Sequence, residues 1–396
     1  MTRKIQTALQ LGALAAAAMA VTSAQALDFG GYFRAGPQTQ SSNGHARNCY
    51  DLDGAGKINA GHYRLGNECN TGGEFIFSQG SKLNNVDAKF NLMVDSWSAG
   101  ATPNTTGGVG IAIMSAELKG IDILPDATFF AGKVRERRQD VHILDHFFTD
   151  MSGVGAGFKG QSIGAGELGF GFYRGDAGAN TGLSRFNLEV QNIALGADNS
   201  LGVVVTAVSG KDANQKNGNA LSVKWASKVA GLDNTVWAQT SKGTASLNGN
   251  FNGGATVTSD DAKWRLVETI NGQSGKLGGQ AVAVIGSSKD AGVKTDVTSL
   301  GGRLSYGVTQ NFKLVGEAGY MTAKAGGTTS KLTKFTIAPT LSTGPDFWTR
   351  PELRLYVTTA KWNGAANAAA GSTGLTGNGD NKTTGTSYGV QAEWWF

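Results

Sequence analysis

The chain has 396 residues, of which 59 are glycine and only 6 are proline, and hydrophobic and charged residues make up 40% and 16% of the total. Both fractions lie below those of a typical soluble domain, which argues against one large packed core. The formal net charge of +5 is too small to indicate a nucleic-acid partner. The composition suits strands that present one face to lipid and the other to water.

The chain begins like an exported protein. Arg3 and Lys4 form a charged segment, Leu9–Val21 is apolar, and Ala24–Ala26 is a small-residue cleavage site, so residues 1–26 are expected to be a cleaved signal peptide. No later stretch supplies the roughly 18 consecutive apolar residues that a membrane helix needs. A β-barrel is therefore the remaining way for this chain to cross a membrane.

The last predicted strand, Thr386–Phe396, carries the clearest pattern, because successive strand side chains point to opposite faces. One face is apolar and consists of Tyr388, Val390, Ala392, Trp394 and Phe396. The other face is mostly polar and consists of Gly389, Gln391, Glu393 and Trp395. Transmembrane barrel strands alternate in this way, with aromatic residues at the membrane interface. Trp395 is the exception, since a water-filled lumen has little use for an indole.

The first predicted strand, Leu27–Gly36, has a second aromatic side chain on its polar face. Tyr32 shares that face with Arg34, two residues further along the chain. The first and last strands of a closed barrel pair with each other. We therefore expect Tyr32 and Trp395 to be neighbours in the lumen.

Runs of alternating residues, separated by clusters of Gly, Asn, Asp and Ser, predict about eighteen strands in all. After the first two, the predicted strands are Asp87–Val94, Ile111–Leu118, Thr128–Val134, Gly155–Lys159, Leu168–Tyr173, Phe186–Ile193, Leu201–Val208, Leu221–Ala226, Thr235–Thr240, Lys263–Ile270, Gln280–Ser287, Leu300–Gly307, Phe312–Met321, Phe335–Leu341, Glu352–Trp362 and Thr386–Phe396. No linker is visible, so residues 27–396 are expected to form a single all-β, antiparallel transmembrane barrel domain.

The second strand is predicted to run from Tyr63 to Glu74. Arg64, Glu68 and Glu74 share one parity, so they would line one face of an unbulged strand. The loop before this strand contains Asp51–Gly54, which resembles part of a calcium loop but lacks the remaining ligands. We interpret it as a plain turn.

Cys49 and Cys69 are the two cysteines of the chain. In an exported protein such a pair is more often bonded than free, so we expect a disulfide that closes a loop of about 20 residues.

The densest cluster of charges lies between Lys133 and His146. Taken alone, it is best interpreted as a solvated surface loop, and the alternative is a loop folded into a pore. Asp140, His142, Asp145 and His146 are residue types that bind metals, but no cysteine and no helical histidine pair accompany them, so no metal is expected.

A second segment, Phe347–Thr358, repeats the pattern of the last strand. Its lumen parity contains Trp348, Arg350, Glu352, Arg354 and Tyr356, whereas Leu353, Leu355 and Val357 face the other way. A third aromatic side chain therefore stands beside charged groups, although a bulge would overturn this parity. The other interpretation places Trp348 in the membrane-interface girdle.

Taken together, these residues resemble the maltoporins, the sugar-specific outer-membrane porins of Gram-negative bacteria. The segments that carry the resemblance are Asp28–Arg34, Tyr63–Cys69, Ala131–Lys133, Arg138–Asp145, Ser152–Gly157, Trp348–Pro351, Ala360–Trp362 and Gln391–Phe396. They cover both ends of the chain and the charged loop, whereas residues 160 to 330 show strand texture with little alignable motif.

The resemblance implies an 18-stranded homotrimeric barrel in outer-membrane lipid, whose third loop folds inward and narrows the pore. It implies an aromatic lane that carries the sugar, made of Tyr32, Trp348 and Trp395. It also implies a polar track beside this lane, made of Arg34, Arg64, Glu74, Arg138 and Asp145. The parity of the Trp348 segment adds Arg350 and Arg354 to the track, and Cys49 and Cys69 match a first-loop disulfide.

The chain also departs from the family pattern. Gly72 replaces a tyrosine of the lane, Ile111 an arginine of the track, and Phe147 a track tyrosine. A lane tryptophan that a neighbouring subunit donates in this family has Trp97 as its candidate, and a mid-barrel phenylalanine has Trp237. The lane looks shortened, which bears on long maltodextrins more than on sugar transport as such.

We therefore expect a carbohydrate-selective channel for oligosaccharides of the maltose and maltodextrin type, without a cofactor. The alternatives are a general diffusion porin, or a porin for another small solute such as sucrose or other oligosaccharides, which would need no aromatic lane. An enzyme is not expected, because none of the four histidines has an evident serine partner and oxyanion arrangement.

Overall fold

The computed structural model describes residues 27–36, 38–40, 49–52, 58–68, 70–99, 108–175, 180–210, 216–252 and 257–396. The predicted signal peptide of residues 1–26 lies outside the described residues. Cys69 lies outside them as well, so its predicted disulfide with Cys49 stays a prediction.

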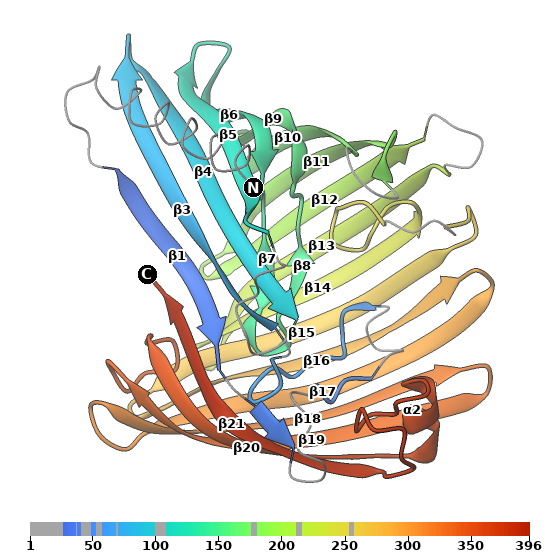
Figure 1. The fold of residues 1–396 in the computed structure, drawn as a ribbon. Coiled ribbons are helices and arrows are strands. Elements are labelled where there is room, and N and C mark those ends of the chain that lie inside the picture. Colours follow the sequence, from blue (N-terminus) through green and yellow to red (C-terminus); the bar gives the residue numbers. More distant parts are fainter. Residues whose placement is uncertain are drawn as a thin grey trace, which may run out of the picture.

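One antiparallel sheet closes on itself to form a barrel whose strands are tilted around a common lumen (Figure 1). The first strand, β1, pairs with both β3 and the last strand, β21, which closes the wall. A short segment, β2, continues β1 along β21 in the same register, so the 19 segments of the sheet make an 18-stranded barrel. The predicted fold class is confirmed.

The strands of the wall are β1 (Asp28–Ala35) with β2 (Gln38–Gln40), β3 (Asn70–Leu83), β4 (Val86–Ala99), β5 (Gly110–Ile121), β6 (Leu124–Val134), β9 (Gly153–Ser162), β10 (Glu167–Arg174), β11 (Ser184–Gly196), β12 (Asn199–Ser209), β13 (Gly218–Val229), β14 (Leu232–Gly243), β15 (Ala262–Ser274), β16 (Leu277–Asp290), β17 (Val293–Gly307), β18 (Phe312–Ala325), β19 (Thr328–Ser342), β20 (Glu352–Trp362) and β21 (Thr384–Trp395). Every predicted strand overlaps one of them, although the second, Tyr63–Glu74, overlaps β3 only from Asn70 onward.

Alternation along each strand sorts the side chains between lipid and lumen, as β20 shows. Leu353 and Leu355 are 53% and 60% exposed on the outer face, whereas Glu352, Arg354 and Tyr356 are buried. Lumen-facing polar residues are buried here because further segments of the chain cover them from inside. The interior of this barrel is therefore partly filled.

Short turns predominate at one end of the barrel, and the long connections lie at the other end, where only the two-residue turns β16–β17 and β18–β19 are short among the described residues. The turn between β3 and β4 consists of Asn84 and Asn85, both with positive φ (50° and 66°). Two left-handed residues in succession form the turn type that matches the right-handed twist of paired strands. In outer-membrane barrels the short turns face the periplasm and the long loops face the outside.

The prediction of a strand from Tyr63 to Glu74 is wrong for its first half. Residues 58–68, here called the inner segment, run inside the barrel and form no strand. Side chains of the wall bind its backbone: the Leu65 N–H donates to Glu317 Oε1 (2.9 Å), and Lys334 Nζ donates to the Leu65 carbonyl (2.7 Å). These contacts replace the strand pairing that a local pattern suggested.

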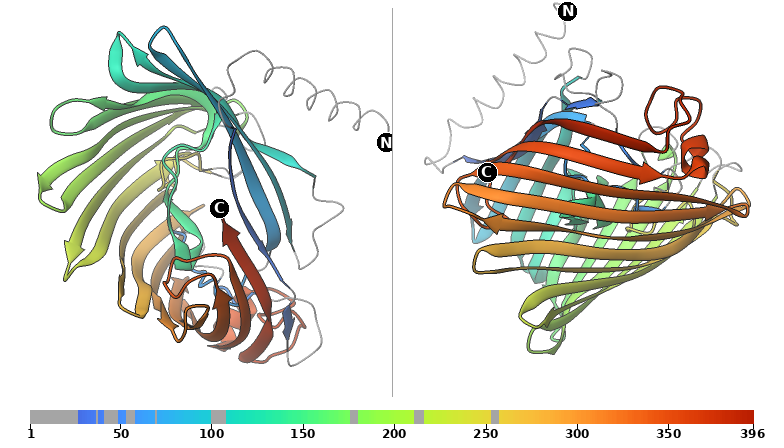
Figure 2. Two further views of the ribbon diagram at one scale, coloured as in Figure 1. Left: turned by 90° about the vertical axis from the view of Figure 1, so that its left-hand side faces the viewer. Right: turned by 90° about the horizontal axis from the view of Figure 1, so that it is seen from below.

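The charged segment does not lie on the surface, so that interpretation is wrong and the inward-folded alternative is right. The third loop, residues 135–152, contains β7 (Gln139–Val141), a 3₁₀ turn (His142–Leu144) and β8 (His146–Thr149), and it passes through the interior (Figure 2).

Four apolar side chains anchor this loop to the wall. Val141, Ile143, Leu144 and Phe148 are all fully buried, in one cluster with inward-facing valines of β15 and β16. Burying four such side chains stabilises the inward position by several kcal/mol, roughly 1.5–3 kcal/mol each. The charges around them dominated the sequence pattern and obscured this apolar set.

One short helix, α2 (Gly364–Ala369), lies in the last long connection. None of the helices in the described part of the chain is long and apolar enough to cross a membrane. Within the same residues no group of three or more His, Cys, Asp or Glu side chains is arranged to hold a metal ion.

Candidate functional site

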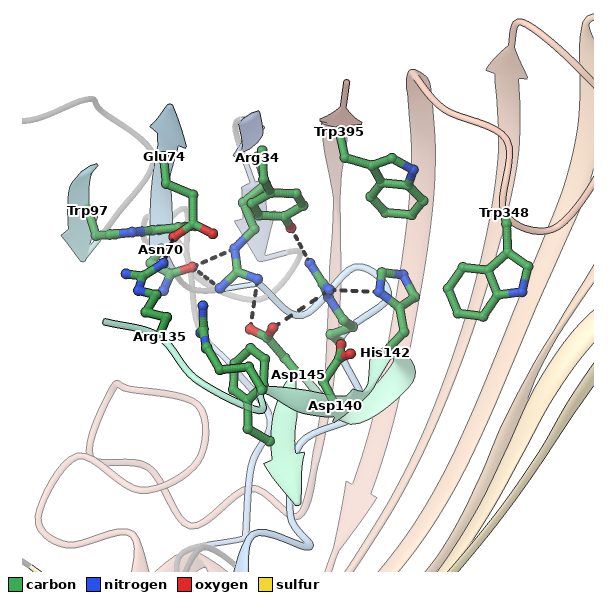
Figure 3. Close-up of a pocket in the computed structure, with 14 residues that line it drawn as sticks. Arg34, Asn70, Glu74, Trp97, Arg135, Asp140, His142, Asp145, Trp348 and Trp395 are labelled. Atoms are coloured by element: carbon green, nitrogen blue, oxygen red, sulfur yellow. Dashed lines mark hydrogen bonds and ion pairs between the residues drawn. The ribbon is translucent and has the colours of Figure 1, made fainter. Parts of the chain in front are cut away.

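A cavity of about 580 Å³ lies in the lumen between strands β1, β3, β4 and β21 on one side and the third loop on the other (Figure 3). That volume is within the usual range for small-molecule sites. Aromatic side chains of the wall and the β19–β20 turn line one side of it: Tyr32, Trp97, Trp348 and Trp395. The polar and remaining lining residues are Arg34, Arg64, Asn70, Glu74, Arg135, Arg138, Asp140, His142, Asp145 and Phe147.

The predicted meeting of the first and last strands is confirmed. Tyr32 of β1 stands directly opposite Trp395 of β21 in the register of the two strands. Trp348 follows Trp395, with ring centroids 6.4 Å apart and planes inclined by 48°. The three rings of the predicted lane therefore all line the cavity from neighbouring positions.

Trp348 reaches this row by a route that differs from the prediction. It lies in the turn before β20, and strand alternation begins only at Glu352, so its assignment by parity is wrong. The turn is held from behind: Lys313 Nζ donates to the Asp346 carbonyl at 2.7 Å, and Arg350 Nη1 donates to the Phe347 carbonyl at 2.9 Å. The conformation of this turn brings the indole to the cavity.

Trp395 is packed between a guanidinium and an imidazole. The Cζ atom of Arg350 lies 4.1 Å from the centroid of the indole, a cation–π contact. The ring of His142 meets the rings of Trp395 and Trp348 edge-on, at 5.6 and 5.3 Å. These neighbours fix the orientation of both indoles, so little side-chain entropy is lost when a ligand stacks on them.

The Tyr32 hydroxyl is fixed by a buried ion pair. It donates to Glu393 Oε1 at 3.0 Å and accepts from Arg64 Nη2 at 2.5 Å. Glu393 is completely buried, and its Oε1 atom lies 2.8 Å from Arg64 Nη2. The polar end of the ring is therefore satisfied by the protein, and the face of the ring is left for the cavity.

Arg34 links strand β1 to the third loop. Its Nη1 atom donates to Asp145 Oδ2 at 2.7 Å, and its Nε atom donates to Asn70 Oδ1 at 2.8 Å. The carboxylate of Glu68 lies 3.6 Å away. The predicted track residues Arg34, Arg64 and Asp145 thus form one connected network at the floor of the cavity.

Arg350 and Arg354 do not line the cavity. Both are buried, at 9% and 1% exposure, behind the row of rings. Arg350 Nε donates to Glu393 Oε2 at 2.9 Å, and Arg354 contacts both Glu393 and Glu352. Their position indicates that the two arginines hold Glu393 and Trp395 in place.

The third loop contributes the polar side of the cavity. Arg138 stacks on Phe147, with Cζ 3.8 Å from the ring centroid, and Asp140 is exposed to the lumen. Neither Arg138 nor Asp140 has an ion-pair partner within 4 Å among the described residues. These two groups are therefore free to bind a ligand.

Sequence reasoning missed Arg135, which contacts Glu74 and lies 3.2 Å from Asp95 Oδ2. Ile111, at which an arginine was expected, is 39% exposed on the outer face and has no access to the lumen. Arg135 supplies a guanidinium to the cavity from the third loop instead. Arg135 belongs to the cluster of charges between Lys133 and His146, but only the inward path of the third loop places its guanidinium in the cavity.

The two tryptophans that the sequence left open have different positions. Trp97 of β4 lines the cavity, with its centroid 6.2 Å from that of Tyr32. Trp237 of β14 is buried at 3% exposure against Phe148, behind the third loop, and does not line the cavity.

A closed wall with an apolar outer face, a polar interior and a lined passage defines a porin of the outer membrane. The family model for the LamB porins matches residues 27–396, and the chain belongs to this family.

Curated relatives of similar length agree with this assignment. The maltoporin of Hahella chejuensis is 28% identical over 86% of this chain and 88% of its own. The maltoporin of Vibrio cholerae (strain N16961) is 29% identical over 88% and 92%, and that of Photobacterium profundum 27% over 93% and 94%.

Solved structures support the fold alone. OccAB1 of Acinetobacter baumannii superimposes with a TM-score of 0.54 at 9% identity, over 93% of this chain and 96% of its own. The anion-selective porin of Comamonas acidovorans gives a TM-score of 0.50 at 13% identity, over 93% and 99%.

Proposed function

We propose that this chain is a carbohydrate-selective channel that gives facilitated diffusion to oligosaccharides of the maltose and maltodextrin type. The observation that carries the proposal is the row of Tyr32, Trp395 and Trp348 that lines the cavity. Charged side chains of the third loop, among them Asp140 and Asp145, lie across the cavity from Trp395 and Trp348 (Figure 3). A pyranose has apolar C–H faces and an edge of hydroxyl groups, so it matches a passage with one aromatic and one polar side.

The aromatic side supplies flat platforms for the sugar. The rings of Trp348 and Trp395 are held by His142 and Arg350, and the ring of Tyr32 is held by its own hydroxyl. A sugar ring stacked on one platform can therefore pass to the next without a rearrangement of the protein. Successive similar sites keep each step shallow, which is what conduction requires.

The polar side supplies hydrogen bonds as water leaves the sugar. Arg138 and Asp140 provide an unpaired donor and an unpaired acceptor two residues apart in the chain. Arg34, Glu74 and Asp145 are already paired within the protein, so they offer only their remaining donor and acceptor sites. Hydrogen bonds to charged groups are strong, and sharing them limits how tightly the sugar is held.

The oligomer and the export pathway belong to the same proposal. We infer a homotrimer, a cleaved signal peptide of residues 1–26 and a first-loop disulfide between Cys49 and Cys69. The resemblance to the maltoporins supports all three.

Reconstitution into planar lipid bilayers tests the function. The ion current through the open channel is titrated with sucrose, maltose and maltohexaose, and we expect concentration-dependent block that strengthens from maltose to maltohexaose. Block by sucrose alone would assign the channel to another small sugar. If no sugar blocks the current, the chain is a general diffusion porin and the proposal fails.

A further inference from the structure

We infer that Trp97 of strand β4 is a fourth ring of the aromatic lane of its own barrel, and that Gly72 is the residue that admits it. This inference rests on the proposed sugar channel. From the sequence, the lane looked shorter because Gly72 replaces a lane tyrosine. With Trp97 as a lane residue, an aromatic ring is present in that part of the lane after all.

The position of Trp97 continues the row. In the strand registers Tyr32 stands opposite Glu74, and Glu74 stands opposite Asp95. Trp97 lies two residues beyond Asp95 on the same face of β4, toward the end of the barrel that carries the long loops. It therefore stands about 6–7 Å further along the strand direction than Tyr32.

The orientation of the Trp97 ring also suits a lane. Its plane is inclined by only 28° to that of Tyr32, with centroids 6.2 Å apart. The Cζ atom of Arg34 lies 5.1 Å from its centroid, so a guanidinium supports the indole of Trp97 as Arg350 supports that of Trp395. Trp97 is half-buried and lines the cavity.

Gly72 provides the space for this ring. It is the register partner of Trp97 on β3, and a Cβ atom built on it would meet the backbone carbonyl oxygen of Ser96 first and would also lie 2.8 Å from Trp97 Cε3. Only glycine therefore lets the backbone of β4 and the Trp97 ring approach β3 this closely. A side chain at this position would have to move both the β4 backbone and the indole, so a ring on β3 and Trp97 in its present position exclude each other.

The consequence is a lane of four rings within one chain. Trp97 lies toward the loop end, Tyr32 and Trp395 follow on paired strands, and Trp348 lies at the turn end. A sugar that enters from outside meets Trp97 first. No ring from a neighbouring subunit is needed at this position.

Sugar-block titrations of Trp97→Leu and Trp97→Phe test the inference, with ion conductance as the measure of a folded channel. We expect about 10-fold weaker block by maltohexaose in Trp97→Leu and near-complete rescue in Trp97→Phe, because the aromatic platform is what counts. The matched control is Trp264→Leu, since Trp264 is 48% exposed on the outer face. Block at the wild-type concentration in Trp97→Leu would overturn the inference.

A second pair of variants tests the role of Gly72. Gly72→Ala should weaken sugar block, because the new Cβ atom meets both the Ser96 carbonyl and the Trp97 ring and so moves the indole from its position. Gly316→Ala is the control, since a Cβ atom there meets only the Thr336 carbonyl, at 4.0 Å. Sugar block at the wild-type concentration in Gly72→Ala would refute the role of Gly72.

Mixed channels decide whether the ring acts in its own barrel. One tagged chain carries Trp97→Leu, and the other carries Tyr32→Ala and Trp395→Ala with Trp97 intact. Weak sugar block in the co-purified channel supports the inference. Wild-type block in the barrel of the Trp97→Leu chain, which keeps Tyr32 and Trp395, would show that a neighbouring chain supplies Trp97. If the wild-type channel shows no sugar block at all, the proposed function fails first, and the inference with it.

Discussion

Glu393 is the residue whose loss should disturb the site most. It is completely buried and accepts a hydrogen bond from the Tyr32 hydroxyl at 3.0 Å. Its carboxylate oxygens lie 2.8 Å from Arg64 Nη2 and 2.9 Å from Arg350 Nε. Arg354 contacts it as well. Substitution Glu393→Gln keeps the shape of the side chain, but removes its charge and points an amide N–H toward a guanidinium.

The expected loss of unfolding free energy depends on which ion pairs of the buried arginines remain after the substitution. Removing one partner of a buried ion pair typically costs about 3–5 kcal/mol, because the other charge stays buried without compensation. Glu68 still contacts Arg64, and Glu352 still contacts Arg354. We therefore expect the lower end of that range for Glu393→Gln, about 3 kcal/mol of unfolding free energy.

Two measurements check this expectation. The free energy of unfolding in detergent or lipid should fall by about 3 kcal/mol. The affinity for maltohexaose should also fall, because the glutamine amide has one acceptor oxygen where the carboxylate has two, so the Tyr32 hydroxyl competes with Arg350 and Arg354 for it. Glu117→Gln is the control: Glu117 forms a half-buried pair with Lys159 at 3.0 Å, and losing such a pair costs about 0–1 kcal/mol.

The reasoning would be refuted by a Glu393→Gln variant that unfolds like the Glu117→Gln control. It would also be refuted if stability fell as expected while sugar affinity stayed at the wild-type value. In that case the hydroxyl of Tyr32 would not depend on Glu393 for its orientation.

Three further predictions concern the lane, the track and the third loop. Trp395→Ala should weaken sugar block about 10-fold at unchanged ion conductance, whereas Trp394→Ala, on the outer face, should not; equal block constants for the two variants would argue against the lane. Arg138→Gln and Asp140→Asn should each weaken sugar block about 10-fold and shift the reversal potential in a salt gradient in opposite directions, toward cations and anions respectively. Shifts of the same sign would contradict their placement in the passage. Ile143→Asp places a carboxylate in a fully apolar contact and should release the third loop from the wall, so single-channel conductance should rise and sugar selectivity fall. An unchanged conductance would show that other contacts hold the loop.

The strands and their lumen faces could be predicted because both follow from a local rule. Lipid on one side and water on the other impose a two-residue period, and that period can be read from any ten residues of the wall. Closure of the barrel then places the first strand beside the last. This is why Tyr32 and Trp395 were correctly expected to be neighbours.

The inner segment and the third loop could not be predicted from a local period. Leu65 is bound by side chains of β18 and β19, more than 250 residues further along the chain, and Ile143 packs against the wall at β15 and β16. Only the closed barrel brings these partners together. The same holds for Arg354, whose parity was right for the lumen side but whose depth was set by what covers it, and for Arg350, which lies in the turn before β20.

Trp395 was recognisable from the sequence alone, since an indole on a polar strand face breaks a rule that each strand obeys. The rest of its surroundings was decided by tertiary structure: the turn that presents Trp348, the loop that brings His142, and the space at Gly72 that Trp97 occupies. Sequence determines which face a strand residue takes, because that choice depends on its immediate neighbours. Which side chains share a cavity depends on contacts between distant segments, and only the folded barrel establishes those.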